Sequence, residues 1–256
     1  RRPRPQSRLT MCVAALAWAA HPRWRLVVAA NRDEFHARPT APLARWDNGV
    51  IAGRDLEAGG TWLGINDAGR FALVTNFRLP GYPRPGLASR GGLVVDWLLG
   101  HPDPSGTALN PFHLLRVGPD GASHVSNQPV PTSSSLAPGL HGVSNGHFDQ
   151  PWPKTQRLTD ALGDWMGQGT DDPAGLFAAL ADETELPPEA DSEGPDTPFS
   201  PVFIRNHTYG TRCSTVVMVD AAGKGTISER RFGADGAPSG QTEIAFCWQL
   251  GGEAPT

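Results

Sequence analysis

Short apolar runs separated by turn-forming residues dominate the hydrophobic pattern of the chain. The first two runs, residues 11–20 and 24–31, are rich in Ala, Val and Trp and are separated by His-Pro-Arg. A Pro-containing turn between two short apolar runs is typical of a hairpin of buried strands. Residues 61–66 and 70–77 repeat the arrangement around Asp-Ala-Gly, which predicts a three-residue hairpin loop with its glycine in the left-handed conformation.

The remaining pattern predicts more strands than helices. Helical spacing of apolar residues occurs at 89–100, 151–169 and 172–183. Ser89 is the expected N-cap of the first helix and Gly100 its C-cap. Further strands are predicted at 112–118, 122–127, 139–145, 212–220, 224–232 and 242–250.

This order of strands, helix, strands, helices and strands, without an internal repeat, predicts an α+β fold with layered sheets. We expect residues 11–256 to form a single domain, which is long enough to bury a sizeable core. Residues 1–10 are expected to be a leader that is disordered or not translated. The acidic, Pro-rich segment 184–201 has no periodicity and is predicted to be a mobile surface loop.

Charge and composition narrow the classes of function. The 22 basic and 26 acidic residues give a net charge of -4, and the body of the chain holds no basic cluster, which argues against nucleic-acid binding. No later apolar run approaches the roughly 18 residues that a membrane span needs. Three scattered cysteines predict neither a disulfide framework nor a zinc site. Because no dinucleotide, P-loop or metalloprotease motif is present, we predict no cofactor and no metal.

The opening stretch, residues 8–21, permits two interpretations. Arginines, about ten apolar residues and an Ala-Trp-Ala sequence resemble a secretory signal that ends near Ala19. Alternatively, Met11 starts a cytoplasmic protein whose first apolar run is a buried strand. The second interpretation is favoured, because the hydrophobic pattern of both early runs predicts two paired strands of one sheet.

Cys12 is the first candidate for chemistry, since removal of Met11 would leave a thiol and a free α-amine on the same residue. An α-amine has a reference pKa of about 7.7–8.0, so it is a usable base near neutral pH. A nucleophile beside its own base is the N-terminal variant of nucleophilic catalysis. The alternative is that Cys12 is a buried strand residue, as free cysteines commonly are.

Polar residues at predicted strand ends supply the other groups such a site requires. Asn-Arg-Asp-Glu at 31–34 directly follows a buried run, although such a group alone is more often a solvated turn. Asn76, Asn145 and Arg212 also lie at strand ends. Together they offer an arginine to favour a thiolate, a carboxylate to hold an amine, and amide donors for an oxyanion.

Longer strings carry a family resemblance. Met-Cys at 11–12, "AANRDEFHARPTAPLARW", "IAGRDLEAGGTWLGIN", "GRFALVTNFR", "VSNGHFDQPWPKTQR" and "TRCSTVV" resemble the NRDE family, whose eukaryotic members are called transport and Golgi organisation protein two. The likeness covers most of the chain. It implies a relationship to N-terminal nucleophile hydrolases of the choloylglycine hydrolase and penicillin V acylase type, and hence a four-layer αββα sandwich of antiparallel sheets.

The resemblance also assigns roles to residues. Cys12 takes the place of the nucleophile, Arg32 and Asp33 those of the Arg and Asp downstream of it, and Asn76 that of the oxyanion donor. The second asparagine and the late arginine correspond to Asn145 and Arg212. In the acylases two residues separate the Arg from the Asp, whereas here they are adjacent and should point to opposite faces of a strand. Both reach Cys12 only if the segment bends or bulges, so Asn31 is expected to contribute, with Glu34, to substrate binding.

The function implied is a cytoplasmic hydrolase of non-peptide C–N amide bonds, acting on a small-molecule amide or an acyl-lipid. The alternative is a binding protein for an acyl-lipid, acyl-CoA or haem without turnover. Any haem would be held non-covalently, because the sequence has no C-x-x-C-H motif.

Overall fold

The computed structural model describes residues 12–102, 108–148, 150–186 and 199–249. The expected leader and most of the expected loop at 184–201 lie outside the described residues. No helix within these ranges is both long and apolar enough to cross a membrane.

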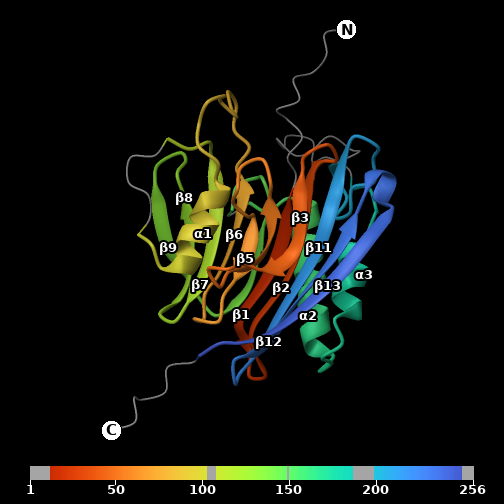
Figure 1. Cartoon of the computed structure of the whole chain (residues 1–256). Helices are drawn as coiled ribbons and strands as arrows, with labels where there is room; N and C mark the ends of the chain where they lie inside the picture. Colours follow the sequence, from red (N-terminus) through yellow and green to blue (C-terminus); the bar gives the residue numbers. More distant parts are fainter. Residues whose placement is uncertain (1–11, 103–107, 149, 187–198, 250–256) are drawn as a thin grey trace.

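Two antiparallel sheets carry the fold (Figure 1). In the described part of the chain, sheet A has six strands in the order β10 (Gly139–Val143), β1 (Val13–His21), β2 (Trp24–Phe35), β11 (Tyr209–Asp220), β12 (Lys224–Phe232) and β13 (Pro238–Cys247). Sheet B has seven, in the order β3 (Thr40–Arg45), β4 (Ile51–Asp55), β5 (Leu63–Ile65), β6 (Phe71–Asn76), β7 (Phe112–Gly118), β8 (Gly121–Ser126) and β9 (Thr132–Leu136).

The main core lies between the two sheets. Leu16, Val28 and Val217 of sheet A join Ile65 and Leu73 of sheet B in one buried cluster, with none of these side chains exposed to solvent. Side chains alternate along each strand, so the opposite face of each sheet needs its own cover.

Helices provide that cover. The outer face of sheet A packs against α2 (Pro153–Gly167) and α3 (Ala174–Leu180), and the outer face of sheet B packs against α1 (Gly91–Leu99). A short 3-10 turn, η3 (Ala234–Gly236), connects β12 to β13. The layers therefore run helix, sheet, sheet, helix, and the predicted αββα sandwich is confirmed.

The first apolar run is a strand within sheet A. β1 pairs with β2 on one side and β10 on the other, and its residues 13–17 are almost completely buried. The register sets Val13 opposite Asn31. Cys12, one residue earlier, therefore lies beside the Asn-Arg-Asp-Glu end of β2.

Some elements differ from the sequence-based expectation. β3, β4 and β9 were not predicted, because β3 contains a proline and one buried residue, β4 is short and partly polar, and β9 is an exposed edge strand. Ser89 is not the N-cap of α1: Arg90 occupies that position, without a side-chain cap. Gly100 is the C-cap as predicted, with φ of 75°.

Candidate active site

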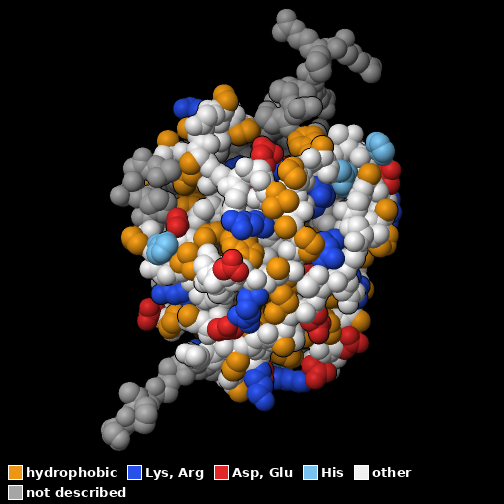
Figure 2. Space-filling view, viewed as in Figure 1, with side chains coloured by type: hydrophobic (Ala, Val, Ile, Leu, Met, Phe, Trp, Pro, Cys, Tyr) orange, Lys and Arg blue, Asp and Glu red, His pale blue; other side chains and the backbone are white. Residues whose placement is uncertain are grey.

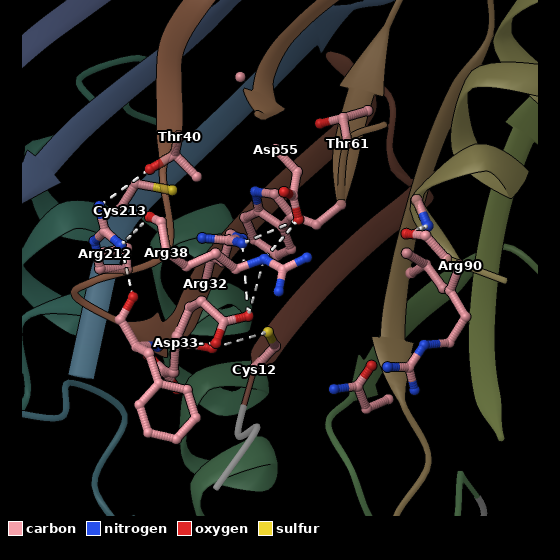
Figure 3. Close-up of a pocket in the computed structure, with 18 of the residues that line it drawn as sticks. Cys12, Arg32, Asp33, Arg38, Thr40, Asp55, Thr61, Arg90, Arg212 and Cys213 are labelled. Carbon is pink, nitrogen blue, oxygen red and sulfur yellow. Dashed lines mark hydrogen bonds and ion pairs between the residues drawn. The ribbon is translucent and has the colours of Figure 1, made fainter. Parts of the chain in front are cut away.

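A cavity of about 680 Å³ opens where the Asn-Arg-Asp-Glu end of β2 meets sheet B. Its walls come from the ends of β2, β4, β6 and β12, the start of β11, and the loop that leads into α1. Cys12, Arg32 and Arg212 line it (Figure 3). Glu34 and Asn76 line it as well. The fold thus brings residues from most of the length of the chain to one hollow.

Cys12 lies at the base of this cavity. Its Sγ is 4.0 Å from the backbone oxygen of Asp33, at the weak limit of a sulfur hydrogen bond. Burial raises the pKa of the Cys12 thiol to about 12, the charge of Asp33 adds to the increase, and Arg32 opposes it. The side chains around Cys12 therefore favour the protonated thiol, so a nucleophilic role needs a further base.

A bulge organises the neighbouring strand. Along the pairing of β2 with β11, Thr211 lies opposite Asp33 and Cys213 lies opposite Arg32, which leaves Arg212 as the extra residue. The expected irregularity thus occurs in β11 rather than within the Asn-Arg-Asp-Glu segment. β2 stays extended, so Arg32 and Asp33 point to opposite faces of the sheet.

Arg32 faces the cavity. Its Nη2 lies 3.7 Å from Glu34 Oε2 and 3.8 Å from Asp55 Oδ2. Asp55 also accepts a hydrogen bond of 2.8 Å from Arg38 Nε. The other terminal nitrogen of Arg32, Nη1, is buried and has no hydrogen-bond partner among the described residues. A buried guanidinium nitrogen of this kind is a donor available to a ligand.

Asp33 directs its carboxyl group away from that wall, toward helix α2. Oδ1 accepts a hydrogen bond of 2.7 Å from Thr211 Oγ1. Oδ2 lies 4.0 Å from Lys154 Nζ and has no hydrogen-bond partner within the part of the chain that the structure describes. Burial raises the pKa of Asp33 to about 7, although Lys154 and Thr211 act to lower it. The same burial lowers the pKa of Lys154. Asp33 thus combines a completely buried carboxyl group with one oxygen that still lacks a donor.

Sequence reasoning missed Lys154. It lies four residues before Leu158 and eight before Leu162, on the face of α2 that packs against sheet A. A lysine within an apolar helical stripe is the signal that could have revealed it, because a lysine that is 1% exposed requires a partner. That partner, Asp33, became identifiable only when α2 was placed on the sheet.

Asn31 does not line the cavity, which corrects its expected role in substrate binding. Its Nδ2 donates to the backbone oxygens of Leu180 and Val202 at 2.8 and 2.9 Å, and its Oδ1 accepts from Ser214 Oγ at 2.7 Å. Strand alternation places Asn31 on the helix-covered face with Asp33. There it joins β2 to α3 and β11. Glu34 lines the cavity, and its role in substrate binding stays a prediction.

The two expected oxyanion donors have different positions. Asn76 lines the cavity, whereas Asn145 is completely buried and donates from Nδ2 to the backbone oxygen of Asn76 at 2.7 Å. Arg78 N donates in turn to Asn145 O at 2.8 Å. Asn145 therefore supports the segment that carries Asn76 and does not itself face the cavity.

Arg212 holds the turn that follows β2. Its Nη1 donates to the backbone oxygens of Phe35 and Arg38 at 2.8 and 3.0 Å, and its Nη2 donates to Thr40 Oγ1 at 3.0 Å. Burial lowers the pKa of the Arg212 guanidinium, with Arg32 nearby adding to the effect. Arg212 thus fixes the wall of the cavity on the side of β3.

Metal chemistry has no obvious ligand set here. Within the described ranges, no group of three or more His, Cys, Asp or Glu side chains is placed to hold a metal ion. The chemically distinctive feature of the cavity is instead a thiol, Cys12, that lines it together with the Arg32 guanidinium and Asn76.

Comparison with known proteins supports the family resemblance that the sequence motifs indicated. The bovine (Bos taurus) Transport and Golgi organization protein 2 homolog is 32% identical over 86% of this chain and 92% of its own length. The Drosophila melanogaster Transport and Golgi organization protein 2 is 29% identical over 84% of this chain and 89% of its own. Among solved structures, a Caenorhabditis elegans ortholog of N-acylethanolamine-hydrolyzing acid amidase has 11% identity and a TM-score of 0.48, over 80% of this chain and 91% of that one. Residues 11–234 match the family described as Transport and Golgi organisation 2, and the chain belongs to this family.

Proposed function

We propose that the chain hydrolyses non-peptide C–N amide bonds, with Cys12 as an N-terminal nucleophile once the residues before it are removed. The observation that carries this proposal is Oδ2 of the buried Asp33, which accepts no hydrogen bond from the described residues. The backbone oxygen of Asp33 lies 4.0 Å from Cys12 Sγ. A buried carboxylate oxygen requires a donor, and the α-ammonium group of a Cys12 chain terminus would supply one.

The reaction follows from that arrangement. The Cys12 α-amine takes the thiol proton, and Sγ attacks the amide carbon. Asn76 is the proposed donor to the developing oxyanion. The C–N bond then breaks, and the leaving amine takes the proton from the α-ammonium group. Water, deprotonated by the same α-amine, attacks the resulting thioester, releases the carboxylic acid and restores the thiol.

The free amine is essential to this mechanism, because a thiol with a pKa of about 12 stays protonated near neutral pH. The α-amine is the base that removes its proton as Sγ attacks. A chain that begins at Cys12 can be made by cleaving an engineered leader, and the uncleaved chain is its matched control. With a panel of fluorogenic N-acyl amides, we expect turnover and an acyl adduct on Cys12 in the cleaved chain alone. Cys12→Ala should abolish both, whereas Cys213→Ser should retain them. Equal turnover with the leader in place would rule out the mechanism.

A second candidate is a non-catalytic protein that binds or handles an acyl-lipid, acyl-CoA or haem. The raised pKa of the Cys12 thiol favours it for any chain that keeps residues before Cys12, because the cavity is then present without an activated nucleophile. Cys12→Ala separates the two candidates. Ligand binding should persist in this variant, whereas hydrolysis should not.

The proposal includes the cytoplasm as the site of action. A thiol nucleophile has to stay reduced, and Cys12, Cys213 and Cys247 are all free thiols in the structure. The small-molecule amide or acyl-lipid remains the proposed substrate class.

A further inference from the structure

The cavity carries a surplus of positive charge in a chain whose net charge is -4. Seven arginines line it, against four carboxylic acids: Arg32, Arg38, Arg54, Arg78, Arg90, Arg212 and Arg231 with Asp33, Glu34, Asp55 and Glu229. Basic and acidic side chains are interspersed over the face seen in Figure 2, with a basic group near its centre. A concave site with an excess of one sign of charge attracts ligands of the other.

Some of these arginines form ion pairs with carboxylates of the cavity wall. Arg38 Nε lies 2.8 Å from Asp55 Oδ2, and Arg32 lies near the same carboxylate. Arg231 Nη1 lies 3.2 Å from Glu229 Oε1. Within each pair the two charges largely cancel. The paired arginines therefore contribute less to the excess positive charge of the cavity than the arginines whose hydrogen-bond acceptors are uncharged.

Arg90 has a different environment. Among the described residues its guanidinium donates to a backbone oxygen, that of Pro111 at 3.1 Å, and forms no ion pair with a carboxylate. Burial lowers the pKa of Arg90. Figure 3 shows Arg90 on the wall across the cavity from Cys12. Glu34 acts on this guanidinium from beyond ion-pair distance and raises its pKa. A partly desolvated guanidinium with no carboxylate in direct contact among the described residues is the kind of group that a bound anion stabilises.

Arg90 also stands at the N-terminus of α1. Among the described residues, Gly91 N at that end of the helix donates to Ser89 Oγ at 3.3 Å, but the first turn holds no acidic residue. A neutral hydroxyl group, and not a carboxylate, therefore faces the partial positive charge of the helix end. Gly91 and Ser89 line the cavity beside Arg90. The same cavity holds a second, independent donor: the buried Nη1 of Arg32, which has no hydrogen-bond partner in the described ranges.

Packing holds this helix end in place. Thr61 N lies 3.4 Å from Gly91 O, and a Cβ added to Gly60 would stand 2.6 Å from Gly91 C. The two glycines therefore allow the backbones of the β4–β5 loop and α1 to touch. Arg90 is thus presented from a fixed support, which lowers the entropy cost of binding a ligand there.

We propose that Arg90 and the N-terminal end of α1 form an anion subsite for a carboxylate or phosphate group of the substrate. This inference rests on the proposed function, since it assigns the substrate an acidic group that docks opposite the Cys12 nucleophile. The substrate class is thereby narrowed to acidic amides.

Anion binding can be measured without turnover in the Cys12→Ala chain, with inorganic phosphate and, separately, glutarate titrated by calorimetry. Arg90→Gln should weaken binding of the preferred anion at least tenfold, and Arg90→Lys should weaken it less. Arg230→Gln is the matched control, because Arg230 stacks over Phe177 on the opposite face of sheet A. It should bind within twofold of the parent. If phosphate binds more tightly than glutarate, the acidic group of the substrate is a phosphate. If glutarate binds more tightly, the acidic group is a carboxylate.

A second measurement avoids dependence on the folding of a variant. Phenylglyoxal modifies arginines, and phosphate or glutarate should protect Arg90 but not Arg230 in the parent chain, as read by peptide mass. Unchanged modification of Arg90, or an Arg90→Gln chain that binds as tightly as its parent, would overturn the subsite.

Turnover distinguishes failure of the subsite from failure of the proposed function. In the chain that begins at Cys12, Arg90→Gln should raise KM at least tenfold for an acidic N-acyl amide and leave KM for its neutral analogue unchanged. Equal effects on the two substrates contradict the subsite while the hydrolase stands. Absent turnover with intact Arg90-dependent binding contradicts the hydrolase, and the anion site stands without its substrate assignment.

Discussion

Asp33 and Lys154 form a charge pair in which neither side chain is more than 1% exposed. Removing one partner of a buried pair typically costs about 3–5 kcal/mol, because the remaining charge is left uncompensated. Here the remaining group can be neutralised, since burial already raises the pKa of Asp33 to about 7. The cost of losing Lys154 should therefore depend on pH.

The sign of that dependence can be worked out. The pKa of Asp33 is higher in the folded protein than its ordinary 3.8, so the folded state binds the proton more tightly. Protonated Asp33 therefore adds to the free energy of unfolding in full below pH 3.8, and this contribution is lost as the pH rises through about 7. Lys154→Met removes a charge that lowers this pKa, so the loss should extend to higher pH.

We expect Lys154→Met to reduce the free energy of unfolding by about 3 kcal/mol at pH 8, and by less at pH 5. Urea unfolding at the two pH values measures the difference. The double variant Asp33→Asn, Lys154→Met is the control and should remove most of the pH dependence. A cost of Lys154→Met that is the same at pH 5 and pH 8 would contradict the pairing.

At the scale of elements, the approach of the β4–β5 loop to α1 sets one wall of the cavity. Gly60 and Gly91 meet backbone to backbone, and a Cβ on Gly60 would also lie 2.8 Å from Gly91 O. These are backbone atoms, so a side chain at Gly60 cannot be accommodated by a rotamer change. A Cβ on Gly92, one residue further into α1, would have no neighbouring atom within 4 Å.

Gly60→Ala should therefore lower the free energy of unfolding by about 1–3 kcal/mol, the usual cost of overpacking. Gly92→Ala should raise it by up to about 1 kcal/mol, because alanine is the better helix former. Chemical denaturation of both variants tests the contrast. If Gly60→Ala proves as stable as the parent, the loop and helix do not touch as described.

The bulge in β11 explains how β2 remains a regular strand and still presents Arg32 to the cavity and Asp33 to helix α2. Arg212 is the extra residue, and it donates to the turn after β2, while Asp33 and Arg32 keep their alternation. The sequence indicated that an irregularity was required but not which strand would contain it. Bulges depend on the pairing partner, which lies about 180 positions away in the chain and has no local signature.

At the scale of the whole molecule, hydrogen bonds between the two sheets hold the cavity together. Asn145, just after β10 of sheet A, donates to Asn76 O at the end of β6 in sheet B. One residue earlier in each segment, Thr75 Oγ1 donates to Ser144 O at 2.7 Å. The position of Asn76 therefore depends on how the sheets are stacked.

Asn145→Ala should cost about 1–3 kcal/mol of stability, because it leaves the partly buried carbonyl oxygen of Asn76 without this donor. In the chain that begins at Cys12, it should also lower kcat at least tenfold through displacement of Asn76. Thr75→Val removes the neighbouring bond between the sheets. Alternation along β6 directs the side chains of Thr75 and Asn76 to opposite faces of the strand. Thr75→Val should lower stability by a similar amount and leave kcat close to that of the parent. Equal losses of kcat in both variants would argue against a positioning role for Asn145.

The sequence by itself predicted the paired apolar runs, the helices within 89–100, 151–169 and 172–183, and the family. It also named six of the residues that line the cavity, which are Cys12, Arg32, Asp33, Glu34, Asn76 and Arg212. Those features are local, because periodicity, turn residues and continuous motifs need no knowledge of distant partners. Only the tertiary structure decided that Asn31 faces the helices, that Asn145 supports Asn76, that Lys154 meets Asp33, and that Arg90 faces Cys12. These relations join residues that are distant in the chain or on different layers. They follow from strand register and layer stacking, which single-strand patterns do not specify.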